Sequence, residues 1–247
     1  MTTATRADSG FWPQRAARLA GFLYLLVIIG GGVAEVAVRT RLVVVNNAVA
    51  TAQAIRAHEQ LFRWGLAADL FGVLCVVPLI LLLYELLRGV NQRVALLALL
   101  FSLIGTAIQS VALIGHFAPL TLLKRGAALG VDVPLLEAQA YMAMQLQGIG
   151  YAIALVFFGG TMMARGYLIW RSAVVPRWIG ALLMVEGIAY WVNTFVTLLA
   201  PDLATTVLGI LMATALAEVA LCLWLLVMGV NVQRWRATAI PLGNQIG

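Results

Sequence analysis

Charged residues are scarce in this chain: of its 247 residues only 11% are Asp, Glu, Lys or Arg, whereas 63% are hydrophobic. Soluble globular domains carry about 25% charged residues. The shortage argues against a soluble domain and predicts an integral membrane protein. The formal net charge of +6 does not indicate a nucleic-acid partner, because the basic residues stand singly or in pairs between apolar segments and form no patch.

Residues that build metal and redox sites are equally rare. The two cysteines, Cys75 and Cys222, lie within apolar stretches and form no Cys-x-x-Cys motif. The two histidines, His58 and His116, show neither His-x-x-x-His nor Glu-x-x-His spacing, so neither a metal centre nor a haem is expected. The phosphate-binding motif Gly-x-x-x-x-Gly-Lys-Ser/Thr is also missing. We therefore expect no metal and no cofactor.

Long apolar segments make up most of the chain, and each is about as long as the 20 or so residues that a helix needs to cross a bilayer. They are residues 16–38, 64–87, 94–123, 135–164, 178–199 and 203–230. The first has no convincing small-residue cleavage site, which favours a retained span over a signal peptide. The expected fold is all-α, a polytopic bundle of six transmembrane helices in one domain (residues 16–230), between an N-terminal segment (1–15) and a C-terminal tail (231–247).

The connections carry their own patterns. Between Arg41 and Arg63 apolar and polar residues alternate at helical spacing, which predicts a short interfacial helix between the first two spans. Residues 166–177 form a basic, amphipathic stretch that we expect to connect the fourth and fifth spans at the membrane surface. Three consecutive glycines, residues 30–32, favour close approach of a neighbouring helix over a kink.

The distribution of basic residues predicts orientation. Ten of them belong to the side that carries both termini and six to the other side. Basic loops favour the cytoplasm, so both termini are expected there, in the cytoplasmic (inner) membrane of a bacterium. The loop between the fifth and sixth spans has no basic residue, which agrees with an outer position.

Polar side chains recur on the spans at intervals that place them on one face of each helix. On the third span they are Ser102, Thr106, Gln109 and His116; on the fourth Glu137, Tyr141, Gln145 and Tyr151; on the fifth Glu186, Tyr190, Asn193 and Thr197; on the sixth Thr214 and Glu218. The second span carries Asp69 near its start. Below the end turns we expect no Lys or Arg in the spans, so the interior is predicted to be acidic with a single histidine.

These faces define a candidate ligand-binding cavity. Its members are Asp69, Gln109, His116, Gln145, Glu186, Tyr190, Asn193 and Glu218. An ionised carboxylate at the bilayer centre costs about 2.5–3.5 kcal/mol on insertion scales, so each buried acid must be protonated, hydrogen-bonded or matched by a cation. Interhelical hydrogen bonding alone is an equally weighted explanation for Glu186 and Glu218.

Three functions fit these residues. The first is binding or transport of a cationic or amphipathic small molecule, with or without proton coupling. The second is an intramembrane enzyme acting on a lipid or isoprenoid, with His116 and a carboxylate as its acid and base. The third is a structural or interaction subunit. The expected partners are membrane lipid and, for the first function, the small ligand; the residues assign no catalytic group.

Three strings carry a family resemblance: ARLAGFLYLLVIIGG at the start, LFRWGLAADLFGVLCVVPLILLLYELLRGVN in the second span, and ALVFFGG followed by GYLIWRSAVVPRWIGALL across the fourth and fifth. Together they resemble the bacterial integral membrane family filed as domain of unknown function 4386. The resemblance covers nearly the whole chain and implies a cytoplasmic membrane protein with about six helices. It implies no activity, so no residue inherits a catalytic role.

Overall fold

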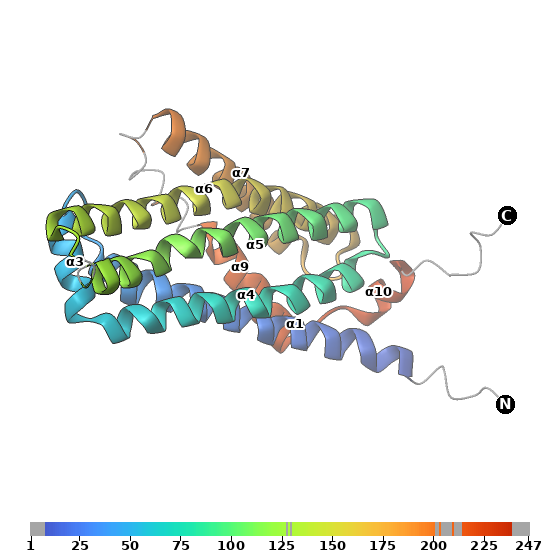
Figure 1. Cartoon of the computed structure of the whole chain (residues 1–247). Helices are drawn as coiled ribbons and strands as arrows, with labels where there is room; N and C mark the ends of the chain where they lie inside the picture. The colour runs from blue at the N-terminus through green and yellow to red at the C-terminus, as the bar shows by residue number, and fades with distance from the viewer. Residues whose placement is uncertain are drawn as a thin grey trace. The chain divides into compact units, whose positions relative to one another are not determined.

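The computed structural model describes residues 8–126, 128, 130–200, 203, 209 and 214–238, and the regular elements in these ranges are helices (Figure 1). The long ones are α1 (Asp8–Gly32), α4 (Glu59–Leu87), α5 (Gln92–Thr121), α6 (Val133–Ser172), α7 (Arg177–Leu199) and α9 (Leu216–Val227). Parts of both terminal segments join helices, because α1 begins at Asp8 and α10 covers Val232–Thr238. Residues 1–7 and 239–247 lie outside the described residues.

Five helices in the described part of the chain are long and apolar enough to cross a membrane. They are Trp12–Leu42, Glu59–Leu87, Gln92–Gly126, Val133–Ser172 and Arg177–Leu199. A sixth is added if α9 and α10, bent by 103° at their junction, count as one span. Most of the first half of the predicted sixth span falls outside the described residues. The prediction of an all-α, polytopic membrane protein is confirmed.

Short helices complete the chain. The π-helix η1 (Val33–Arg39) extends α1 and is followed by α2 (Thr40–Leu42), and the π-helix η2 (Leu122–Gly126) extends α5. Helix α3 (Ala48–Ala57) is the short helix predicted between the first two spans. The Asn47 side chain caps it by accepting a hydrogen bond from the Ala50 N–H over 2.8 Å.

The predicted end of the fourth span was wrong. Helix α6 continues through the expected surface connection to Ser172, which makes it 40 residues and about 60 Å long. No proline lies between Ala164 and Ser172, and the chain turns at Ala173–Pro176. Arg165 therefore lies inside α6, where its side chain is buried.

The chain forms two compact units, and α1, α4, α5 and α6 contribute residues to both. The first unit contains Met1–Leu25, Val76–Gly105 and Leu155–Gly247; the second contains Leu26–Cys75 and Thr106–Ala154.

In the first unit α1 packs closely on α9. A Cβ at Gly21 would lie 2.5 Å from the Leu226 nitrogen, so only glycine permits this approach. The Cys222 thiol donates to the Gly21 carbonyl oxygen over 3.4 Å. Buried packing is thus the role of Cys222 here.

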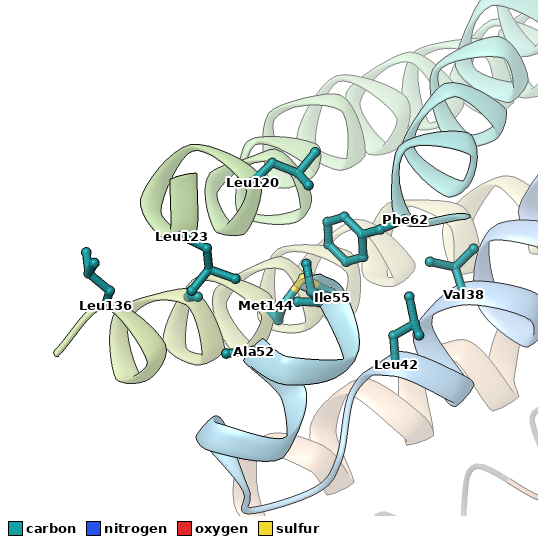
Figure 2. Close-up of a cluster of buried hydrophobic side chains, with 10 residues drawn as sticks. Val38, Leu42, Ala52, Ile55, Phe62, Leu120, Leu123, Leu136 and Met144 are labelled. Atoms are coloured by element: carbon teal, nitrogen blue, oxygen red, sulfur yellow. The ribbon is translucent and has the colours of Figure 1, made fainter. Parts of the chain in front are cut away.

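The second unit has a hydrophobic core that joins α3 to the neighbouring helices (Figure 2). Its fully or nearly buried members are Val38, Leu42, Ala52, Ile55, Phe62, Leu120, Leu123, Leu136, Ala140 and Met144. Ala52 and Ile55 come from the apolar side of α3, and each is 1% exposed. This packing fixes α3 against α5 and α6, and it places Phe62 beside the first of the two polar clusters described below.

Candidate functional site

Ionisable side chains inside the helices gather in two clusters, one in each unit. The second unit holds Arg39, Asp69 and His116, which we call the arginine–aspartate–histidine cluster. The Arg39 Nη1 lies 2.6 Å from Asp69 Oδ2, and Asp69 is 5% exposed. The ion pair supplies the positive charge that a buried carboxylate requires.

The π-helix η1 places Arg39 in this cluster. Its wider turns follow directly after the three glycines, and Thr40 Oγ1 donates to the Glu35 carbonyl over 3.0 Å. Arg39 Nε also donates to Glu35 Oε2 over 2.6 Å, so the guanidinium binds two carboxylates. Short π-helical segments occur frequently at functional sites. A Cβ at Gly30 would lie 3.0 Å from the Ala68 carbonyl oxygen, so α4 approaches the first helix closely at this glycine, as predicted.

His116 is completely buried on α5. Its Nδ1 is 3.4 Å from both Asp69 Oδ2 and Arg39 Nη1, and its ring meets the edge of Phe62 with 4.5 Å between centroids. Its Nε2 has no hydrogen-bond partner among the described residues. An imidazole with one nitrogen beside a carboxylate and the other unpaired is oriented for proton transfer or for hydrogen bonding to a ligand.

The first unit holds the second cluster, which we call the glutamate cluster: Glu186 and Tyr190 from α7, Glu218 from α9, Tyr24 from α1 and Arg165 from α6. Glu186 is completely buried, and Tyr190 donates its hydroxyl to Glu186 Oε1 over 3.2 Å. The Glu218 carboxyl interacts electrostatically with Glu186 and with the Arg165 guanidinium, and it neighbours both tyrosines. Glu186 Oε2 has no hydrogen-bond partner among the described residues.

These clusters correct the prediction of an interior without Lys or Arg. Arg39 and Arg165 each lie beside buried carboxylates, so basic charge reaches the acids in both units. Sequence reasoning assigned both arginines to the membrane surface because each adjoins the end of a predicted span. The signal for Arg165 was present: apolar or small residues flank it on both sides, from Ala164 to Trp170.

The remaining predicted residues differ in burial. Asn193 is buried and Gln109 is half-buried, whereas Gln145 is exposed and donates to the Tyr141 hydroxyl over 3.3 Å. Thr197 is also exposed, so the polar face of α7 ends near Asn193. The predicted face of the fourth span is split, because Glu137 is buried while Tyr151 is 40% exposed.

Glu137 has its own basic partner, since Arg56 Nη1 of α3 donates to Glu137 Oε1 over 2.6 Å. Among the described residues, no three His, Cys, Asp or Glu side chains converge as a metal ion would require. The side chains of the two clusters can themselves transfer protons and pair charges.

A family model described as "Domain of unknown function (DUF4386)" matches residues 19–229, and the chain belongs to this family. The chain is also similar to an uncharacterized protein of Archaeoglobus fulgidus, with 23% identity over 176 residues. That match covers 68% of this chain and 90% of the archaeal protein. No solved structure matches the chain. Neither the family description nor the archaeal relative names an activity.

Proposed function

We propose that this protein binds a proton between Glu186 and Glu218 and couples its release to the binding or transport of a cationic or amphipathic small molecule. The observation that supports the proposal is the composition of the glutamate cluster: two carboxyl groups face one guanidinium, that of Arg165. With both acids ionised the three groups carry one negative charge. One proton or one monovalent cation makes them neutral.

An unbalanced negative charge inside a membrane has a free-energy cost. An uncompensated carboxylate in the bilayer costs about 2.5–3.5 kcal/mol on insertion scales, so the cluster favours a state with one proton or one cation bound. A cation that binds beside the pair takes over the neutralising role of the proton. Cation binding and proton release are then linked, and by reciprocity a higher proton concentration weakens cation binding.

Burial assigns different roles to the two acids. Glu186 is completely buried, whereas Glu218 is half-buried. We place the arriving cation at Glu218. Glu186 supplies the second negative charge, and Tyr190 holds its Oε1 in position.

The test is to titrate purified protein in detergent with cationic, neutral and anionic small molecules, from about pH 5 to pH 8, and to follow thermal unfolding. Cations should stabilise the protein more at higher pH. Glu186→Gln and Glu218→Gln should abolish this pH dependence. Glu137→Gln is the matched control, since it removes a buried carboxylate that Arg56 already pairs, and it should leave cation binding unchanged.

Proteoliposomes test the coupling directly. An imposed pH gradient should drive uptake of a cation found in the titration, and Glu186→Gln should uncouple uptake from the gradient. Stabilisation by anions alone, or cation binding that ignores both substitutions, would contradict the proposal. The buried acids would then serve only as hydrogen-bonding groups between helices.

For the location of the protein we propose the bacterial cytoplasmic membrane, with both termini in the cytoplasm. The ten-to-six distribution of basic residues supports this orientation.

A second candidate function is an intramembrane enzyme acting on a lipid or isoprenoid. The specific observation in its favour is His116, whose Nδ1 lies 3.4 Å from Asp69 while Nε2 is buried and unpaired among the described residues. Incubation of the protein with labelled lipid extracts, followed by mass spectrometry, tests this function. A product that appears with the wild type and disappears with His116→Gln would support it.

A further inference from the structure

The first unit has a hollow of about 530 Å³ where the turn between α6 and α7 meets α10. Two arginines and two hydroxyl residues line it: Arg177, Arg234, Ser172 and Thr238. Arg177 is the first residue of α7, and Arg234 lies in the middle of α10. Neither the glutamate cluster nor the arginine–aspartate–histidine cluster contributes to this hollow.

Specific hydrogen bonds hold its walls together. The Asn231 N–H donates to the Val174 carbonyl over 2.9 Å, and Arg234 Nη1 donates to the Ala173 carbonyl over 3.3 Å. The Trp235 indole donates to the Leu86 carbonyl over 3.1 Å, which ties α10 to the end of α4. Hydrogen bonds therefore join the walls of the hollow, and helices α7 and α10 carry its two arginines.

Positive charge dominates this region. Arg171 and Arg236 lie beside the hollow on α6 and α10, and both are exposed. No aspartate or glutamate occurs in residues 138–185 or 219–247. Glu85, at the end of α4, is already paired with Arg88 at 2.9 Å. The hollow therefore favours an anion.

The chemistry of the lining fits a phosphate group. A guanidinium presents paired N–H donors that match phosphate oxygens, and two of them border the hollow. Helix α7 begins here at Pro176 without a side-chain cap, so the first backbone N–H groups of a 23-residue helix also face this end. Together these donors suit a tetrahedral oxyanion better than a planar carboxylate.

The tryptophans indicate where such a phosphate comes from. Trp12 contacts Trp235 with 5.8 Å between ring centroids, and Trp170 and Trp178, near the same turn, are 48% and 53% exposed. Tryptophan concentrates at the headgroup level of membranes. Trp178 and Trp235 directly follow the lining residues Arg177 and Arg234 in the sequence, at the ends of predicted spans, and this is the depth of lipid phosphates.

We propose that this hollow binds the phosphate of an anionic membrane phospholipid, held by Arg177 and Arg234. Basic pockets at the ends of transmembrane helices are known to take anionic headgroups. The site is independent of the glutamate cluster and of any transport function.

The experiment measures lipid binding to the full chain in a neutral detergent by native mass spectrometry and thermal unfolding. Phosphatidylglycerol should bind and stabilise the protein, and phosphatidylcholine should not. Arg177→Gln and Arg234→Gln should each weaken phosphatidylglycerol binding by about tenfold, the effect of one charge-assisted contact. Arg236→Gln, which removes the same charge from α10 outside the hollow, should weaken it by less than about twofold.

Two further arms make the outcome decisive. Inorganic phosphate and glycerol 3-phosphate, added at the lipid concentration, should not stabilise the protein; equal stabilisation would overturn the lipid as the source. Among the described residues the Arg177 side chain makes no hydrogen bond or ion pair, unlike that of Arg234, which donates to the Ala173 carbonyl. Arg177→Gln therefore keeps the test valid if Arg234→Gln misfolds. Equal loss of binding in Arg177→Gln and Arg236→Gln would show that only net charge matters and would overturn the site.

Discussion

The Arg39 guanidinium and the Asp69 carboxylate lie 2.6 Å apart in the second unit, with side-chain exposures of 16% and 4%. The two residues come from η1 and α4, so their pairing joins helices that are distant in the sequence. His116 lies 3.4 Å from both of them. The stability of this part of the protein therefore depends on charge balance as well as on packing.

Breaking this pair should be costly. Arg39→Gln leaves the buried Asp69 carboxylate without its positive partner and should lower the free energy of unfolding by about 3 kcal/mol. Asp69→Asn should cost less, because Arg39 keeps its ion pair with Glu35. The double variant should cost less than the sum of the two, because it removes both charges. Thermal unfolding of the four proteins in one detergent measures the coupling. Additive effects would show that the pair contributes nothing of its own.

The sequence predicted the helices well because apolar length and helical spacing are local signals. The second, third and fifth spans, the short helix after the first span and the buried polar faces around His116 and Glu186 follow from such patterns. The burial of Glu186 and Asn193 needed only their spacing along one helix.

The partners of the buried acids were not predictable in the same way. Arg39 pairs with Asp69 because the π-helix η1 extends the first span as far as Arg39. A hydropathy pattern does not predict a π-helix. Arg165 is buried because α6 continues to Ser172, although a basic residue normally ends a span. In both cases a tertiary contact, absent from any local pattern, decides where the charge lies.

The contribution of α3 can be divided between packing and charge. Ile55 is 1% exposed in the hydrophobic core, whereas the Arg56 side chain that pairs with Glu137 is 38% exposed. Ile55→Ala should cost about 2–4 kcal/mol of unfolding free energy. Arg56→Gln should cost about 1–2 kcal/mol, because it leaves the buried Glu137 carboxylate unpaired at an end of the pair that water reaches. Arg63→Gln, in an exposed pair with Glu59, is the control and should cost less than either. A larger loss for Arg56→Gln than for Ile55→Ala would show that charge, not packing, holds α3.

Topology can be tested with two reporter fusions. A fusion after Arg88 should report the cytoplasm, and one after Pro201, which lies outside the described residues, should report the opposite side. The expected difference follows from the bias of basic residues toward the cytoplasmic loops. Paired reporters, one active only in the cytoplasm and one only outside it, provide the measurement. The same location for both fusions would overturn the six-span topology.

Two glycine pairs set the distance between α6 and α7 in the first unit. A Cβ at Gly166 would lie 2.6 Å from the Gly180 carbonyl oxygen, and one at Gly187 would lie 2.7 Å from that of Gly159. The two glycines on each helix lie seven positions apart in the sequence. Gly159 faces Gly187 and Gly166 faces Gly180, as two antiparallel helices require. The Trp191 indole donates to the Val156 carbonyl over 2.8 Å beside the second pair. The backbones therefore touch at two levels, two helical turns apart.

Adding a methyl group at any of these glycines should force the helices apart. Gly166→Ala, Gly180→Ala and Gly187→Ala should each lower the unfolding free energy by about 1–3 kcal/mol, because the clash is with backbone that has no rotamer to change. Gly148→Ala on α6 is the control: nothing lies within 4 Å of its Cβ position. It should be neutral or stabilising by up to about 1 kcal/mol through helix propensity. Thermal unfolding in detergent measures the stability of all four variants. Because the glutamate cluster includes residues of both helices, the three destabilising changes should also weaken cation binding. Equal stability of all four variants would show that α6 and α7 do not approach at these glycines.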